Sequence, residues 1–234
     1  MPISREKRMT QSLKVRVSSA QGCEKFKRTS SASNIITSNS TCGQKYNLIS
    51  EGSLSCLYPN PSSNQSTNLL NRLLHQSKIS YSWETHTIVL EESQIVTKTT
   101  PKGMFTSGIP FSSILKVTTF KMPKAPKCTK VFTKDGNFLL QAPSVHLQDQ
   151  WFYSLQWKVT VNKYKDILME AKSDVLLQEL KLLVSLAMSF PLHVADTHIP
   201  VLNIVSQLLS KKAVTMSNLS QEELITALAP LVEN

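Results

Sequence analysis

The sequence predicts an α+β fold in which an antiparallel β-barrel is closed by one helix and followed by several shorter helices. Two changes of pattern indicate this. From residue 45 to residue 141, short apolar runs alternate with period two and are separated by proline and glycine, which is typical of antiparallel strands. From residue 144 onward, apolar residues recur every three or four positions, as on one face of a helix.

The bulk composition fits a soluble globular protein of one or two domains. The chain has 234 residues, a hydrophobic fraction of 41% and a net charge of +10. No apolar run approaches the roughly 18 residues needed to cross a bilayer, and the N-terminus lacks the apolar segment of a secretory signal. The four cysteines are scattered without a C-x-x-C pair, so we expect free thiols in the cytoplasm or nucleus and no bound metal or other cofactor; they are Cys23, Cys42, Cys56 and Cys128.

Residues 1–44 form a basic, serine-rich tail that we expect to be disordered. Residues 1–41 contain eight basic and two acidic residues and too few apolar ones to offset the entropy of ordering. Ser30 and Ser31 follow a basic cluster and are candidate phosphorylation sites for a basophilic kinase. Nucleic-acid binding would depend on this tail alone, so no specific nucleic-acid partner is expected.

Six or seven short strands are expected in the barrel. The apolar periodicity places them at residues 45–58, 81–90, 94–100, 111–120, 128–133 and 137–141, with the first run forming one strand or a pair. A leucine stripe predicts a short helix over 67–78 between the first two. Asp135-Gly136 is the clearest turn signal, because glycine supplies the positive φ that a tight hairpin needs.

The helix that follows the strands is the organising element of the sequence. Leu147, Trp151 and Leu155 recur every four residues and therefore share one helix face, while Ser144 is suited to the N-cap. Periodicity alone favours an ordinary core helix that uses a large aromatic residue. The strands before it favour a helix that closes a barrel, and the helical pattern continues to about residue 171.

These residues resemble a pleckstrin-homology (PH) domain, whose family pattern ends in a helix with one near-invariant tryptophan, here Trp151. Among PH domains, the chain resembles the c-Maf-inducing protein family most specifically. Five segments carry this resemblance: D-Q-W-F-Y-S-L-Q-W-K at 149–158, N-K-Y-K at 162–165, K-Y-N-L-I-S-E-G at 45–52, S-Q-L-L-S at 206–210 and A-L-A-P-L-V-E-N at 227–234. The resemblance covers about residues 45–234. It implies a non-enzymatic intracellular signalling adaptor, found in cytoplasm and nucleus, that docks partner proteins. The family continues into leucine-rich repeats that this sequence lacks.

The basic residues favour protein docking over lipid head-group recognition. PH domains that hold phosphoinositides carry a K-x-n-K/R-x-R pattern across the first two strands, and residues 45–90 contain only Lys45, Arg72 and Lys78. Basic residues in later loops are candidates for a weak anionic-lipid surface; they are Lys98, Lys102 and Lys121, with Lys124 and Lys127 nearby. The alternative function is thus a peripheral membrane module that binds phosphoinositides.

Residues 172–234 predict a partial, armadillo-like helical module after the barrel domain at 45–171. Asp174 is expected to cap its first helix, Pro191 to end it, Pro200 to sit in the first turn of the second, and 220–223 to form the capping box of the third. A helical stack must cover its last apolar face, so a chain ending at Asn234 suggests a truncated product or a partner that caps it.

Two further features have competing interpretations. Trp157 is a candidate partner-binding residue, and the alternative is packing between the two modules. His193, Asp196 and His198 form an H-x-x-D-x-H pattern without zinc-motif spacing, so a solvated loop is expected rather than a metal site. No residue pattern predicts a catalytic site.

Overall fold

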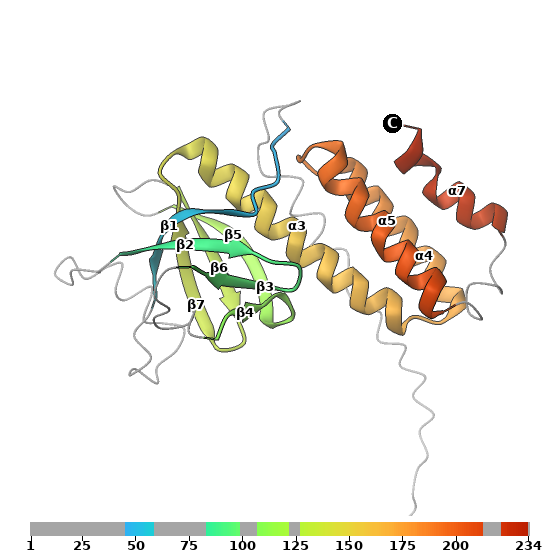
Figure 1. Ribbon diagram of the computed structural model, residues 1–234, viewed down its shortest axis with the longest axis horizontal. Helices are drawn as coiled ribbons and strands as arrows, with labels where there is room; N and C mark the ends of the chain where they lie inside the picture. The colour runs from blue at the N-terminus through green and yellow to red at the C-terminus, as the bar shows by residue number, and fades with distance from the viewer. Residues whose placement is uncertain (1–44, 59–82, 99–106, 122–126, 213–220, 234) are drawn as a thin grey trace, which may run out of the picture. The chain divides into compact units, whose positions relative to one another are not determined.

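The computed structural model describes residues 45–58, 83–98, 107–121, 127–212 and 221–233, which belong to one compact unit of the chain (Figure 1). The predicted helix at 67–78, Lys102, Ser30, Ser31 and Ser220 of the predicted capping box lie outside these residues. Within the described ranges, no helix is both long enough and apolar enough to cross a membrane.

A curved antiparallel sheet of seven strands forms the first part of the fold. Its order is β4-β3-β2-β1-β7-β6-β5, and every neighbouring pair is antiparallel. The strands are β1 Glu51–Leu57, β2 Glu84–Leu90, β3 Gln94–Thr97, β4 Ile109–Pro110, β5 Ile114–Lys121, β6 Lys127–Thr133 and β7 Gly136–Gln141. The two ends of this order, β4 and β5, are joined by the short 3-10 helix η2 Phe111–Ser113, so the sheet curls into a barrel. The predicted antiparallel barrel is confirmed.

The strand boundaries differ from the prediction at three places. β1 begins at Glu51, and residues 45–50 leave the sheet. The predicted strand at 111–120 begins only at Ile114, because Phe111 turns inward in η2 and is buried. The β6–β7 turn is formed by Lys134 and Asp135, and Gly136 opens β7 with φ +146°, a value that L side chains rarely adopt. Position 136 therefore favours glycine. In a two-residue Asp-Gly turn the glycine would be the second turn residue, whereas here it follows directly after the two turn residues.

Alternate side chains of the strands fill the barrel. On β1 these are Leu54 and Cys56, and β2 contributes Ile88 and Leu90. From the other half of the sheet come Val131, Phe138 and Leu140. This alternation follows from the two-residue period of a strand, which sends every second side chain to the same face.

Four helices follow the sheet: α3 Val145–Glu170, α4 Ser173–Ser189, α5 Val194–Lys211 and α7 Gln221–Val232. Helix α3 has 26 residues, about 39 Å of helix, and packs against η2, β5 and β6. Figure 1 shows that α3 crosses the sheet and extends beyond it, where α4 and α5 lie alongside. One helix therefore belongs to both the barrel and the helical region.

Two helix starts were predicted wrongly. Helix α4 begins at Ser173 after Lys172, which puts Asp174 inside the first turn instead of at the N-cap. Helix α5 begins at Val194, so Pro200 lies inside it and not in its first turn. A proline in a helix interior removes one hydrogen bond and is normally unfavourable. A hydrogen bond between α3 and α5 accommodates Pro200.

Candidate functional site

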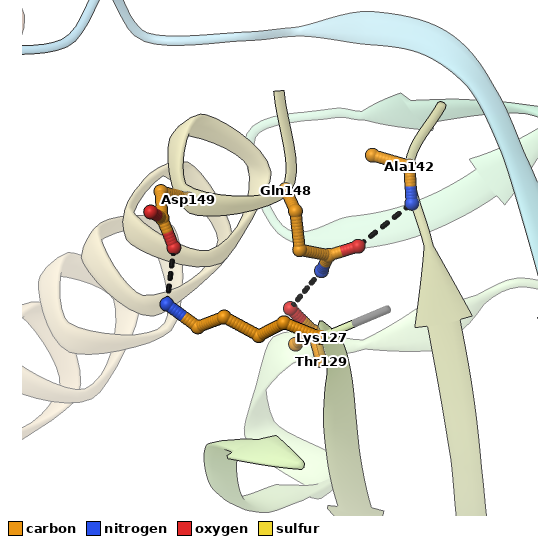
Figure 2. Close-up of polar contacts among 5 residues, drawn as sticks. All are labelled: Lys127, Thr129, Ala142, Gln148 and Asp149. Carbon is orange, nitrogen blue, oxygen red and sulfur yellow. Dashed lines mark hydrogen bonds and ion pairs between the residues drawn. The ribbon is translucent and has the colours of Figure 1, made fainter. Parts of the chain in front are cut away.

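The N-terminal end of α3 is anchored to the barrel by polar side chains (Figure 2). Ser144 is the N-cap, as predicted, and its hydroxyl accepts a hydrogen bond from the Leu147 amide at 3.2 Å. The buried Gln148 side chain accepts from the Ala142 amide at 2.7 Å and donates to the Thr129 hydroxyl at 2.6 Å. Both contacts satisfy groups that water cannot reach, so they fix the angle at which α3 leaves the sheet.

The ion pair between Lys127 of β6 and Asp149 of α3 adds to this anchor (Figure 2). Both side chains are about a quarter exposed, so solvent screens the pair only in part. Lys127 is therefore not a free cation of the expected lipid surface. Asp149 serves this pair and lies beyond the first turn of α3, where a negative charge gains little from the helix dipole.

Two of the three residues that were predicted to share the inward face of α3 are buried. Trp151 and Leu155 are buried, and Trp151 lies over Gly52 of β1, where an added Cβ would sit 3.1 Å from Trp151 Cζ2. Leu147 is instead 36% exposed. Gln148 takes the inward position one residue later, because its amide has partners on β6 and at the end of β7. Trp151 is thus buried against the first strand of the barrel.

Trp157 lies at the junction between α3 and the later helices. Its side chain is 1% exposed, and its ring packs on Phe190 with the centroids 5.0 Å apart. Its indole N–H donates to the Asp196 carbonyl of α5 at 3.0 Å. The residue expected as a partner contact is therefore enclosed in the protein, which is the geometry of the alternative, packing between modules.

This indole contact explains how α5 tolerates Pro200. In an α-helix the amide of residue 200 would donate to the carbonyl of residue 196. Proline has no amide hydrogen, so the Asp196 carbonyl needs another donor, and Trp157 supplies it. A sequence signal for this site exists, since a proline inside a helical pattern marks the carbonyl four residues earlier as unpaired.

Residues 45–50, which the sequence assigned to the first strand, tie the barrel to the helices. The Tyr46 amide donates to the Pro191 carbonyl at 3.0 Å, and the His193 amide donates back to the Tyr46 carbonyl at 2.9 Å. The Leu48 amide donates to an Asp196 carboxylate oxygen at 2.9 Å. The same segment reaches α3, where the Ile49 amide donates to the Ser154 hydroxyl at 2.9 Å. We call residues 45–50 the strap.

Aromatic rings fill the space under the strap. Tyr46 lies 5.3 Å from Tyr153 and 5.4 Å from His146, measured between ring centroids, and Tyr153 meets Phe190 edge-on at 6.3 Å. Burial, followed by the negative charge of Asp149, raises the pKa of both tyrosines, so their hydroxyls stay protonated near neutral pH. The junction is a packed aromatic core and not an open cleft.

The H-x-x-D-x-H residues belong to this junction, and the expected solvated loop was wrong. His193 is the N-cap residue of α5, and Asp196 lies in its first turn. His198 is buried, and its Nδ1 lies 3.0 Å from the Leu231 carbonyl of α7. A carbonyl oxygen can only accept, so Nδ1 carries the hydrogen. In the described part of the chain, no three His, Cys, Asp or Glu side chains are gathered to hold a metal.

A lysine from the end of α5 closes the other end of the junction. Lys212 Nζ donates to the carbonyls of Leu168 at 3.2 Å and Ala171 at 2.7 Å, which are at the C-terminal end of α3. A cation there satisfies carbonyls that lack helical partners and complements the helix dipole. Sequence reasoning missed Lys212 and considered Asp196 and His198 only as a metal-like pattern in a loop, because the partners of all three are 30 or more residues distant in the chain.

Of the expected lipid surface, Lys98 and Lys121 are among the described residues, and they lie at the ends of two different strands. Lys98 follows β3 and pairs with Glu51 of β1. Lys121 ends β5, and four strands separate β3 from β5 in the sheet order. Lysines are instead concentrated along β5 and β6, where Lys116, Lys121 and Lys130 lie within two neighbouring strands.

The cysteine inside the barrel is chemically protected. Burial, as the main cause, raises the pKa of the Cys56 thiol to about 12, despite a hydrogen bond with Tyr58 that lowers it. Burial also raises the pKa of Cys128. A thiol with a raised pKa is a poor nucleophile, because the thiolate is the reactive form.

The match to a protein family agrees with this architecture. Residues 45–169, more than half of the chain, match the family described as the C-Maf-inducing protein PH domain. Among solved structures, the solution structure of the N-terminal PH domain of human ARAP2 is similar at 15% identity and a TM-score of 0.33, with 53% of this chain and 85% of that chain covered. The family match confirms the resemblance and the PH fold predicted from the sequence. The chain belongs to the C-Maf-inducing protein PH domain family.

Proposed function

We propose that this chain is a non-enzymatic signalling adaptor that docks partner proteins through its PH domain. PH domains are interaction modules that bind proteins or phosphoinositides and are typically non-catalytic. We also propose that the protein is located in the cytoplasm and nucleus. In this proposal the PH-like domain extends from residue 45 to residue 171, after the tail and before the helical module, and the tail is phosphorylated at Ser30 and Ser31. The resemblance to an intracellular adaptor family supports the docking function and the location, and the basic cluster before Ser30 and Ser31 supports their modification.

One observation favours proteins over lipid head groups as the ligand. The strap, Trp157 and Lys212 join the barrel to α4 and α5 by hydrogen bonds between elements far apart in the chain. A domain that only holds a head group has no need of such a connection. A fixed arrangement of barrel and helices offers a partner protein a large surface of constant shape, which lowers the entropic cost of docking.

The alternative, phosphoinositide binding, has less support from the charged residues. Lys98 is engaged by Glu51, and an exposed pair of this kind competes with a phosphate for the same ammonium group. A scattered basic surface without a second anchor gives only weak membrane attachment.

The two functions are separated by comparing proximity labelling with vesicle binding, both with the full chain. We expect a reproducible set of labelled signalling proteins, and vesicle binding that does not depend on phosphoinositide content. The control is Lys98→Gln with Lys102→Gln, which should leave the labelled set unchanged. Saturable binding to phosphoinositide vesicles that this double variant abolishes, with no specific labelled proteins, would replace the adaptor function with the membrane one.

A further inference from the structure

Strand β5 is an edge strand of the sheet. It runs for eight residues and lies at the end of the sheet order, and it pairs only with β6 among the described strands. After an irregularity between Ile114 and Lys116, the pairing is regular as far as Lys121 opposite Lys127. An antiparallel edge strand directs alternate backbone N–H and C=O groups away from its neighbour, and these groups can pair with an additional strand.

The side chains at this edge are basic and apolar. Leu115 is 66% exposed, and Lys116 and Lys121 are exposed. Lys130 of β6 is directly opposite Thr118 of β5. We call Leu115, Lys116, Lys121 and Lys130 the β5 edge surface.

None of the three lysines of the β5 edge surface forms an ion pair within the described residues. The Lys130 ammonium instead lies over two aromatic rings, 4.6 Å from the centroid of Phe132 and 5.7 Å from that of Phe120. Burial lowers its pKa, which means that the protein disfavours the charged form there. A carboxylate placed beside Lys130 would stabilise its charged form. The nearby Lys127 already has such a partner, because it forms an ion pair with Asp149.

Charge decides which kind of strand fits this edge. A second copy of β5 would place exposed lysines beside exposed lysines, and like charges on paired strands are destabilising. An extended segment with acidic residues at alternate positions would meet Lys116 and Lys130 on one face. A lipid head group or a nucleic-acid phosphate would meet the same lysines but would leave the backbone groups of the edge unpaired.

We propose that the β5 edge binds an extended acidic segment of a partner protein, which adds to the sheet as an eighth strand in the described order. This inference rests on the proposed docking function and gives it a surface and a partner chemistry. The backbone pairing supplies orientation, and the lysines select acidic sequences over basic ones.

The test uses the full chain and a synthetic peptide of alternating glutamate and valine, with amide chemical shifts and affinity as readouts. We expect shifts in the amides of 115–121, and a loss of affinity of at least about tenfold in Lys116→Glu/Lys130→Glu. The matched reversal Lys163→Glu/Lys181→Glu on α3 and α4 should change affinity less than about twofold. The single variant Lys116→Glu changes an exposed position and should lose part of the affinity. It serves as a second test in case the double variant misfolds.

Two N-methylated peptides test the strand pairing itself. Methyl groups on alternate amides block one edge of the peptide only, so one of the two peptides should lose binding and the other retain it. Equal binding of both, or shifts outside β5 and β6, would overturn the proposal. So would lysine-dependent binding to phosphatidylserine vesicles without peptide binding.

The adaptor function has a separate readout. If the charge-reversed chain still labels the same proteins in cells at wild-type levels, the β5 edge is not the docking surface and the adaptor function stands. If the wild-type chain labels no specific proteins, the adaptor function fails whatever the peptide does.

Discussion

The hydrogen bond from Trp157 to the Asp196 carbonyl allows a quantitative test by a double-mutant cycle with Pro200. Trp157→Phe removes the donor that this carbonyl has among the described residues and leaves a smaller ring beside Phe190. Leaving a buried acceptor unpaired costs about 1–3 kcal/mol, and the smaller ring leaves a cavity worth about 1 kcal/mol more. We therefore expect a loss of about 3 kcal/mol in the free energy of unfolding, or about 6–12 °C in Tm for a chain of this size.

The second substitution makes this reasoning specific. Pro200→Ala supplies the missing backbone N–H, so the Asp196 carbonyl gains a donor within α5. In that background Trp157→Phe should cost about 1–2 kcal/mol less, because the carbonyl is no longer unpaired. Urea unfolding followed by far-ultraviolet circular dichroism measures all four proteins without relying on tryptophan fluorescence. An equal cost of Trp157→Phe in both backgrounds would refute the proposed role of the hydrogen bond.

Three further predictions concern the barrel. Gly52→Ala should lower the urea midpoint by the equivalent of about 1–3 kcal/mol, because the new Cβ would press on Trp151; an unchanged midpoint would show that Trp151 is not fixed there. Gln148→Leu should cost about 1–3 kcal/mol by leaving the buried Ala142 amide unpaired, and an unchanged urea midpoint is the contrary outcome. Cys56 should resist iodoacetamide at about pH 8 in the native chain, as read by mass spectrometry, and fast alkylation would count against its burial. Because its pKa is raised from 9.0 to about 12, it adds stability that is present below pH 9.0 and is lost as pH rises toward 12.

The sequence predicted the parts of the fold that depend on local periodicity. The two-residue period of the strands and the four-residue period through Trp151 and Leu155 each report which face of one element is buried, and both were read correctly. The Ser144 cap was also confirmed, since a cap involves only the first turn of its own helix.

Three of the errors share a physical cause, which is a polar partner on another element of the fold. Leu147 fits the apolar period better than Gln148, but the amide of Gln148 is satisfied by Thr129 and is therefore buried. Pro200 reads locally as a helix start, and only the indole of Trp157 makes it acceptable inside α5. The strap has the alternation of a strand, yet its backbone groups pair with α5 and the turn before it. No local pattern contains such partners.

The β5 edge surface illustrates the same limit for function. Lys121 was noticed as a basic residue, but its place on an edge strand, and the position of Lys130 opposite Thr118 on the next strand, follow from the strand order and register. In the sequence alone, the lysines fall in several separate predicted loops. The sheet places three of them on two neighbouring strands, and this placement is what motivates the proposal of an acidic strand as the docked partner.

The central claim is that the barrel and the following helices form one docking platform joined by the strap, Trp157 and Lys212. Native-state hydrogen exchange on the full chain at increasing urea tests it most directly. We predict that the amides of Leu48 and Ile49, which donate to α5 and α3, exchange with the same opening free energy as the protected amides of α3 and α5. Fast exchange of these two amides, together with separate opening of α5 and the barrel strands, would show two independent modules and contradict the account.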